Sequence, residues 1–137
     1  MPIGPVPHIL IAPDTLSGEP CLGNHRLPIA MIGEHVRTVG VTATMRDYTL
    51  TRAEVLTACW FLGAYGITRI HKPGRHRRPA RYRVTQDGRT VRKWRKWAER
   101  NAAAFWDGHY SEIPDPPLPR ALHTAQTADL LTQPVAV

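Results

Sequence analysis

The segment 67–100 carries residue types that could hold phosphate groups. It contains 13 Lys or Arg residues against two acidic residues, a net charge of +11, whereas the rest of the chain has a net charge of −4. Such asymmetry favours an acidic partner, most often nucleic acid, because cations contact phosphate oxygens and arginine also enters a narrow minor groove. The candidate DNA contacts here are Arg75, Arg77, Arg78, Arg81, Arg83, Arg92, Lys93 and Lys96.

Two simpler uses of this basic segment stay open. The cations could form a solvated surface that only keeps the protein in solution, or they could pair with an acidic protein. The mixture of arginine with prolines and alternating apolar residues favours nucleic acid over the first use.

Other chemistry has weaker support in the sequence. The seven histidines and two cysteines show no spacing typical of a zinc site, and no serine lies in a nucleophile-elbow pattern. A phosphate-binding glycine loop is also missing. We therefore expect no metal, no cofactor and no enzymatic activity. Cys59 lies within an apolar helix, and we expect it to be a small buried side chain.

The basic residues must be positioned by two predicted elements. "ITRI" and "RYRV" have strand character and flank the basic loop "HKPGRHRRPA", which predicts a hairpin with a projecting tip. A helix is predicted from about residue 89 to 106, with one apolar stripe and a basic remainder. Trp97 lies off that stripe and is the predicted partner contact of this helix.

Before the basic segment, the pattern predicts three short helices, over residues 28–40, 41–48 and 51–65. Thr51 and Glu54 have the spacing of a capping box, and Gly66 is expected to end the third helix in a left-handed conformation. "HILIAP" predicts a short strand, and "DTLSGEPCLGNHRLP" predicts a loop or small hairpin.

These elements predict a mainly α fold. It consists of a three-helix homeodomain-like or helix-turn-helix bundle with a short N-terminal β element, a possible β-wing and a basic C-terminal helix. The expected divisions are a flexible N-terminus at 1–8, the three-helix domain at 9–66, the wing and helix at 67–106, and a Pro-rich disordered tail at 107–137.

The third helix is apolar on two sides, so something beyond the three-helix bundle must cover its second side. That side carries Leu56, Trp60 and Gly63, and exposing it would leave an apolar patch that soluble monomers rarely tolerate. A second copy of the chain is the favoured cover, which makes these residues a predicted dimer interface. The alternative cover is the C-terminal helix of the same chain.

The stretches "GEPCLGNHRLPIAMIGEHV" and "YTLTRAEVLTACWF" are similar to the domain of unknown function 433 family. That family has a glycine-rich approach, a G-x-R-[IL]-P-[VI] step into the first helix, and a Leu-Thr-acidic entry into the third. The chain departs from the pattern by one extra residue between Gly23 and Arg26. The resemblance covers residues 9–66. It implies a three-helix bundle, usually dimeric, in bacteria and their mobile elements, and some members are antitoxins of PIN-domain ribonuclease toxins.

A second stretch, "AYGITRIHKPGRHRRPARYRVTQDGRTV", resembles the wing of winged-helix regulators. In that pattern a helix ends at a glycine, a strand follows, a basic loop projects, and a second strand closes before "T-x-x-G-R". Thr85, Gly88 and Arg89 fit this ending.

Together these features predict a dimeric, DNA-binding transcriptional regulator of antitoxin type. The first turns of the third helix, with Thr51, Arg52 and Thr57, are expected to approach the major groove. The alternative is a protein-interaction module that neutralises a PIN-type ribonuclease toxin or serves an assembly. Because no run of about 18 apolar residues occurs, we expect no membrane span and a cytoplasmic location.

Overall fold

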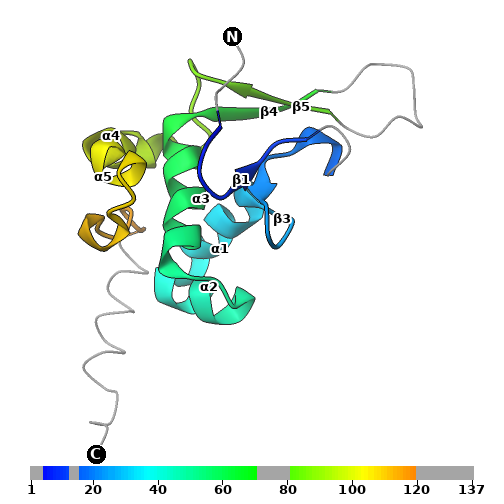
Figure 1. Ribbon diagram of the computed structural model, residues 1–137. Coiled ribbons are helices and arrows are strands. Elements are labelled where there is room, and N and C mark those ends of the chain that lie inside the picture. The colour runs from blue at the N-terminus through cyan, green and yellow to red at the C-terminus, as the bar shows by residue number, and fades with distance from the viewer. Residues whose placement is uncertain (1–4, 13–15, 71–80, 120–137) are drawn as a thin grey trace, which may run out of the picture.

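The computed structural model describes residues 5–12, 16–70 and 81–119 (Figure 1). The described part holds five α-helices and two small sheets, so the fold is a mixture of α and β rather than mainly α. Its helices are α1 (Ile29–Val39), α2 (Val41–Tyr48), α3 (Arg52–Ala64), α4 (Arg95–Arg100) and α5 (Ala102–Trp106), with 3-10 turns η1 (Leu16–Gly18), η2 (Arg92–Trp94) and η3 (Tyr110–Glu112). Its strands are β1 (Ile9–Leu10), β2 (Cys21–Leu22), β3 (Leu27–Pro28), β4 (Gly66–Ile70) and β5 (Arg81–Thr85).

The three predicted N-terminal helices are confirmed, with boundaries within one residue or so of the prediction. In α1 the i, i+3, i+7 set Ile29, Ile32 and Val36 is fully buried, as its spacing predicts. Gly40 ends α1 with a positive φ of 89°, a conformation that favours glycine. α2 begins at the next residue, so α1 and α2 are joined with almost no loop.

Both predicted β regions are also confirmed. β1, β2 and β3 form an antiparallel sheet in that order, and β4 pairs antiparallel with β5 in a separate hairpin. The expected role of Gly66 is wrong, because it opens β4 and does not adopt a left-handed conformation. Glycine fits there because an added Cβ would lie 2.8 Å from the Thr85 hydroxyl oxygen and 3.1 Å from the Gly88 carbonyl carbon.

Helix α3 is the centre of the fold. Every residue from Glu54 to Gly63 is buried, so this helix has no solvent face for most of its length. Figure 1 shows α1 and α2 on one side of α3 and α4 and α5 on the other, with the β4–β5 hairpin beyond its C-terminal end. The buried hydrophobic residues of all these helices belong to one cluster.

The second apolar side of α3 is covered by the same chain. The Trp60 ring stacks on Phe105 with centroids 4.0 Å apart, and its indole N–H donates to the Ala98 carbonyl oxygen at 3.0 Å. Leu56 is fully buried, and Gly63 lies directly against the Trp94 backbone. The predicted dimer interface at Leu56, Trp60 and Gly63 is therefore wrong, and the alternative of a C-terminal cover is confirmed.

The C-terminal cover is not the single helix that the sequence predicts for 89–106. It consists of the turn η2 followed by α4 and α5, which are separated at Asn101. The Trp97 carbonyl oxygen accepts from both the backbone N–H of Asn101, at 3.1 Å, and its side-chain amide, at 2.8 Å. Asn101 itself has φ −106° and ψ 10°, outside the regular helical conformation. After this residue, α5 places Phe105 against Trp60.

The chain after α5 packs against the fold as far as it is described, so the disorder predicted from residue 107 is wrong for 107–119. The Trp94 indole N–H donates to the Pro117 carbonyl oxygen at 2.8 Å, and the Trp97 indole N–H donates to that of Pro114 at 2.9 Å. Ile113, just before Pro114, is buried. Residues 120–137 lie outside the described residues. At the other end, Val6 is buried, which corrects the flexible N-terminus for 5–8.

Within the described residues, no helix combines the length and apolarity needed to cross a bilayer.

The contact between α3 and the C-terminal cover can be tested at Gly63. An added Cβ would lie 2.5 Å from the Trp94 carbonyl oxygen and 2.9 Å from its carbonyl carbon, so Gly63→Ala must displace the backbone of η2. Overpacking of this kind costs about 1–3 kcal/mol, which exceeds the gain in helix propensity of about 1 kcal/mol. We expect a lower free energy of unfolding in urea.

Gly23→Ala is the control, because the Cβ added at residue 23 would lie 3.5 Å from the Leu10 Cβ, which is an ordinary contact distance. Its unfolding free energy should change by less than about 0.5 kcal/mol. If Gly63→Ala were as stable as the parent, the backbone of η2 would not lie against α3.

Candidate nucleic-acid interface

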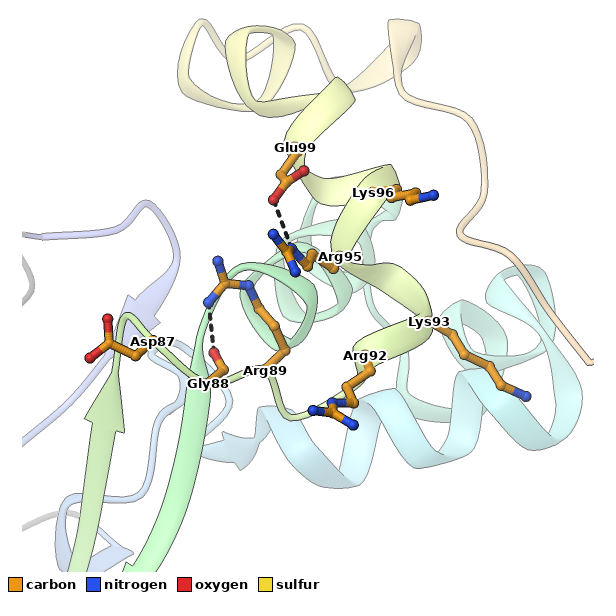
Figure 2. A pocket seen from close by; sticks show the side chains of 8 residues that line it. All are labelled: Asp87, Gly88, Arg89, Arg92, Lys93, Arg95, Lys96 and Glu99. Atoms are coloured by element: carbon orange, nitrogen blue, oxygen red, sulfur yellow. Dashed lines mark hydrogen bonds and ion pairs between the residues drawn. The ribbon is translucent and has the colours of Figure 1, made fainter.

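A cleft of about 830 Å³ lies between the end of the β4–β5 hairpin and the segment that forms η2 and α4 (Figure 2). Five of its eight lining residues are cationic and two are acidic. The lining comprises Asp87, Gly88, Arg89, Arg92, Lys93, Arg95, Lys96 and Glu99. The basic segment therefore forms a concave surface at this cleft.

The sequence pattern explains why cations face solvent here. Val91, Trp94, Trp97 and Ala98 are buried against the fold, whereas the basic residues between them are exposed. The backbone N–H of Val91 donates to the Leu62 carbonyl oxygen at 3.0 Å, which ties the start of η2 to α3. The predicted cations Arg92, Lys93 and Lys96 are consequently all exposed.

The cations of the cleft differ in how they are engaged. Arg95 pairs with Glu99 at 3.0 Å, and an Arg89 terminal nitrogen donates to the Gly88 carbonyl oxygen at 2.8 Å. The Arg89 Nε is buried and lacks a partner in the described part of the chain. Figure 2 shows Arg89 extending from its loop toward α4, whereas Lys93 and Lys96 extend outward from the helical segment.

Arg92, Lys93 and Lys96 have no ion pair or hydrogen-bond partner for their side chains among residues 5–12, 16–70 and 81–119. Three arginines elsewhere in the described chain are paired: Arg37 with Glu34 at 3.6 Å, Arg46 with Asp47 at 3.5 Å, and Arg52 with Asp115 at 2.6 Å. Arg26, Arg69, Arg81 and Arg83 form no ion pair among the described residues. Unpaired positive charge therefore lies at the cleft and on the hairpin as well as at Arg26, and an anionic ligand needs such charge.

The hairpin extends this positive surface. Arg81 and Arg83 are exposed on β5, two residues apart and so on one face of the strand. They are paired in register with Ile70 and Thr68 of β4. The predicted contacts Arg75, Arg77 and Arg78 lie outside the described residues.

The N-terminal turn of α3 does not form the surface that was predicted to read the major groove. Thr57 is fully buried, with its hydroxyl unpartnered in the described structure, so it cannot contact DNA. Arg52 donates to the Asp115 carboxylate and, at 2.8 Å, to the Ile113 carbonyl oxygen. Thr51 is exposed but serves as the N-cap, accepting a hydrogen bond from the Glu54 backbone at 3.2 Å. The prediction for Thr57 is wrong because the core encloses this residue. Arg52 is engaged by the C-terminal segment, and its predicted role stays a prediction.

Glu54 anchors this turn through charge. Burial disfavours its charged form, but the hydrogen bonds from the Thr51 backbone and hydroxyl, each at 3.0 Å, and the His25 ring at 2.8 Å outweigh burial. The pKa of the Glu54 carboxyl is therefore lower than usual. The capping box predicted from the sequence is confirmed.

A second pocket, of about 360 Å³, adjoins the cleft and was missed from the sequence. It is lined mainly by aromatic and small side chains, namely Trp60, Ala64, Tyr65, Gln86, Arg89, Ala98, Glu99, Ala102 and Trp106. Trp106 is 49% exposed, whereas Trp97, the predicted partner contact, is buried and that prediction is wrong. The signal available in the sequence was the position of Trp106 at the end of the last predicted helix.

The buried thiols and the histidines offer little chemistry. Burial raises the pKa of both the Cys21 and Cys59 thiols, which disfavours reactive thiolates. In the part of the chain that the structure describes, no group of three or more His, Cys, Asp or Glu residues could hold a metal ion.

No protein-family model, curated protein or solved structure matches this chain. The resemblances drawn from the sequence therefore stay predictions.

The charge of Glu54 makes a prediction about stability and pH. Because its pKa in the folded protein lies below the ordinary 4.5, the stability it contributes is present above about pH 4.5 and is lost as pH falls through the folded value. Glu54→Gln should lower the free energy of unfolding by about 1–2 kcal/mol at pH 6. The difference from the parent should shrink at pH 3, measured by urea unfolding at each pH.

Glu34→Gln is the control, because that side chain is 73% exposed and pairs only loosely with Arg37. Its effect should be small at both pH values. If Glu54→Gln lowered the free energy of unfolding by the same amount at pH 3 and pH 6, the charge of Glu54 would not be what stabilises the fold.

Proposed function

We propose that this chain is a duplex-DNA-binding protein of the antitoxin-regulator type that holds DNA through its phosphates. The observation that carries the proposal is the set of unpaired cations at the cleft, Arg92, Lys93 and Lys96, beside a hairpin that presents Arg81 and Arg83. Phosphate contacts supply most of the affinity of such proteins and need no particular base sequence.

The order of elements supports a helix-turn-helix-like scaffold, with α1 to α3 as its core and β4–β5 as a wing. α3 does not serve as a reading helix in this proposal, because its sides are buried and Arg52 is held by Asp115. Binding should then depend weakly on sequence. A homodimer, which duplex operators would suit, must use a surface other than Leu56, Trp60 and Gly63.

The double variant Arg92→Gln, Lys93→Gln tests the proposal on a random duplex of about 20 base pairs. It should bind less tightly, and the slope of log affinity against log salt should flatten by about 0.9 for each phosphate that the variant no longer neutralises. The matched control is Arg37→Gln, Arg46→Gln, which removes the same charge from arginines that already pair with carboxylates. Its slope should equal that of the parent.

Three results would contradict the proposal: no binding by the parent protein, an unchanged slope for the cleft variant, or equal weakening by the cleft and control variants. Polyglutamate is a further competitor in this experiment, because it supplies carboxylates without phosphates. If it displaced the duplex as well as an equal charge of competitor DNA, the cations would serve an acidic protein, which is the toxin-neutralising alternative.

A further inference from the structure

The aromatic pocket beside the cleft has the composition of a binding site for a flat, unsaturated group. It is formed where α3, the end of the β4–β5 hairpin, α4 and α5 meet. Its volume of about 360 Å³ lies in the range of small-ligand sites, about 300–1,000 Å³. Its polar lining residues, Gln86, Arg89 and Glu99, supply both hydrogen-bond donors and acceptors.

Trp106 is the open wall of this pocket. It is 49% exposed, whereas Trp60, Trp94 and Trp97 are each exposed by 4% or less. Its ring meets Trp60 nearly edge-on, at 82° with centroids 5.5 Å apart, and Phe105 at 69° with centroids 5.2 Å apart. Neither contact is a parallel stack of the kind that Phe105 makes with Trp60.

The pocket adjoins the cation cleft. Arg89 and Glu99 line both, so one wall separates the aromatic surface from the unpaired cations. The buried Arg89 Nε, which has no partner in the described chain, lies in this shared wall. One ligand could fill both sites if it joined a flat ring, which would lie in the pocket, to a chain of anions, which would pair with the cations of the cleft.

We infer that this pocket accepts one unpaired nucleobase, stacked on Trp106, while the neighbouring phosphates of the same strand lie on the cleft. The inference rests on the proposed function and adds to it that strands with unpaired bases are ligands. Bases in an intact duplex stack on one another, so their faces are not available to a protein ring. Stacking on tryptophan tolerates any base and is common in proteins that bind single strands.

The test compares two single strands of about 12 nucleotides, oligodeoxythymidylate and an abasic strand of the same length. Both carry the same phosphates, but only the first carries bases. Trp106→Ala should weaken binding of oligodeoxythymidylate roughly five- to 150-fold, the effect of removing one stacked base. Binding of the abasic strand should change by less than about twofold, because the cations that hold its phosphates are unaltered. Trp106→Phe should recover most of the affinity, because phenylalanine also stacks.

The cleft variant Arg92→Gln, Lys93→Gln separates the two proposals. It should weaken both strands, whereas Trp106→Ala should weaken only the strand with bases. If the cleft variant weakens both and Trp106→Ala weakens neither, the base pocket is wrong and phosphate binding stands. If neither variant weakens either strand, the proposed function itself fails.

Two further outcomes would overturn the inference. Equal weakening of both strands by Trp106→Ala would show that Trp106 supports the fold of the cleft, and thermal melting of the variant would detect this. Thymidine monophosphate supplies one base and one phosphate, and we expect it to bind much more weakly than the strand. Equal affinity for both would identify the ligand as a free nucleotide.

Discussion

The packing of the Trp94 backbone against Gly63 is the contact on which the rest of the structure depends. With glycine at this position, η2 can approach α3 more closely than any side chain would permit. The approach brings α4 over Trp60 and directs the intervening cations to solvent. The same packing therefore produces both the core and the charged surface. The apolar residues of 91–98 cover α3, and the basic residues between them are exposed to solvent.

Because of this packing, α3 and the segment that covers it have different roles. α3 becomes the core of the protein, and its first turn is held by the Glu54 capping box and by the pair between Arg52 and Asp115. In the proposed function, ligand contacts the surface that covers α3. There Arg92, Lys93 and Lys96 lack carboxylate partners, and an exposed tryptophan lines the adjoining pocket. A nucleic-acid ligand would match both features, with phosphates on the cations and a base on the ring.

The sequence predicted those features that are encoded by neighbouring residues. Thr51 and Glu54 specify the start of α3, Gly40 separates α1 from α2, and alternating residues specify the β4–β5 hairpin. It did not predict features that depend on which distant surfaces meet. A second apolar stripe on α3 has the same pattern whether another chain or the same chain covers it. The hydrogen bonds from Trp94 and Trp97 to proline carbonyls order a segment whose composition alone predicts disorder.

The candidate nucleic-acid interface was predicted only in part for the same reason. Charge counts located the cations of 92–96, because charge is readable from composition. They could not show that Arg52 is held by Asp115, 63 positions away, or that Thr57 is fully buried. The pocket at Trp106 depends on the break at Asn101, which a continuous helical pattern conceals.

We propose that ligand binds the surface over α3 and not the N-terminal turn of α3. Titration of the protein with oligodeoxythymidylate, followed by amide and indole NMR signals, tests it most directly. The indole N–H groups of Trp60, Trp94 and Trp97 each donate to a backbone carbonyl, whereas that of Trp106 has no such partner in the described chain. We expect shifts at the Trp106 indole and at the amides of Arg89, Arg92 and Lys93, with the indoles of Trp94 and Trp97, which do not line the pocket, unchanged. Shifts concentrated at Thr51 and Arg52, with none at the cleft, would contradict the account.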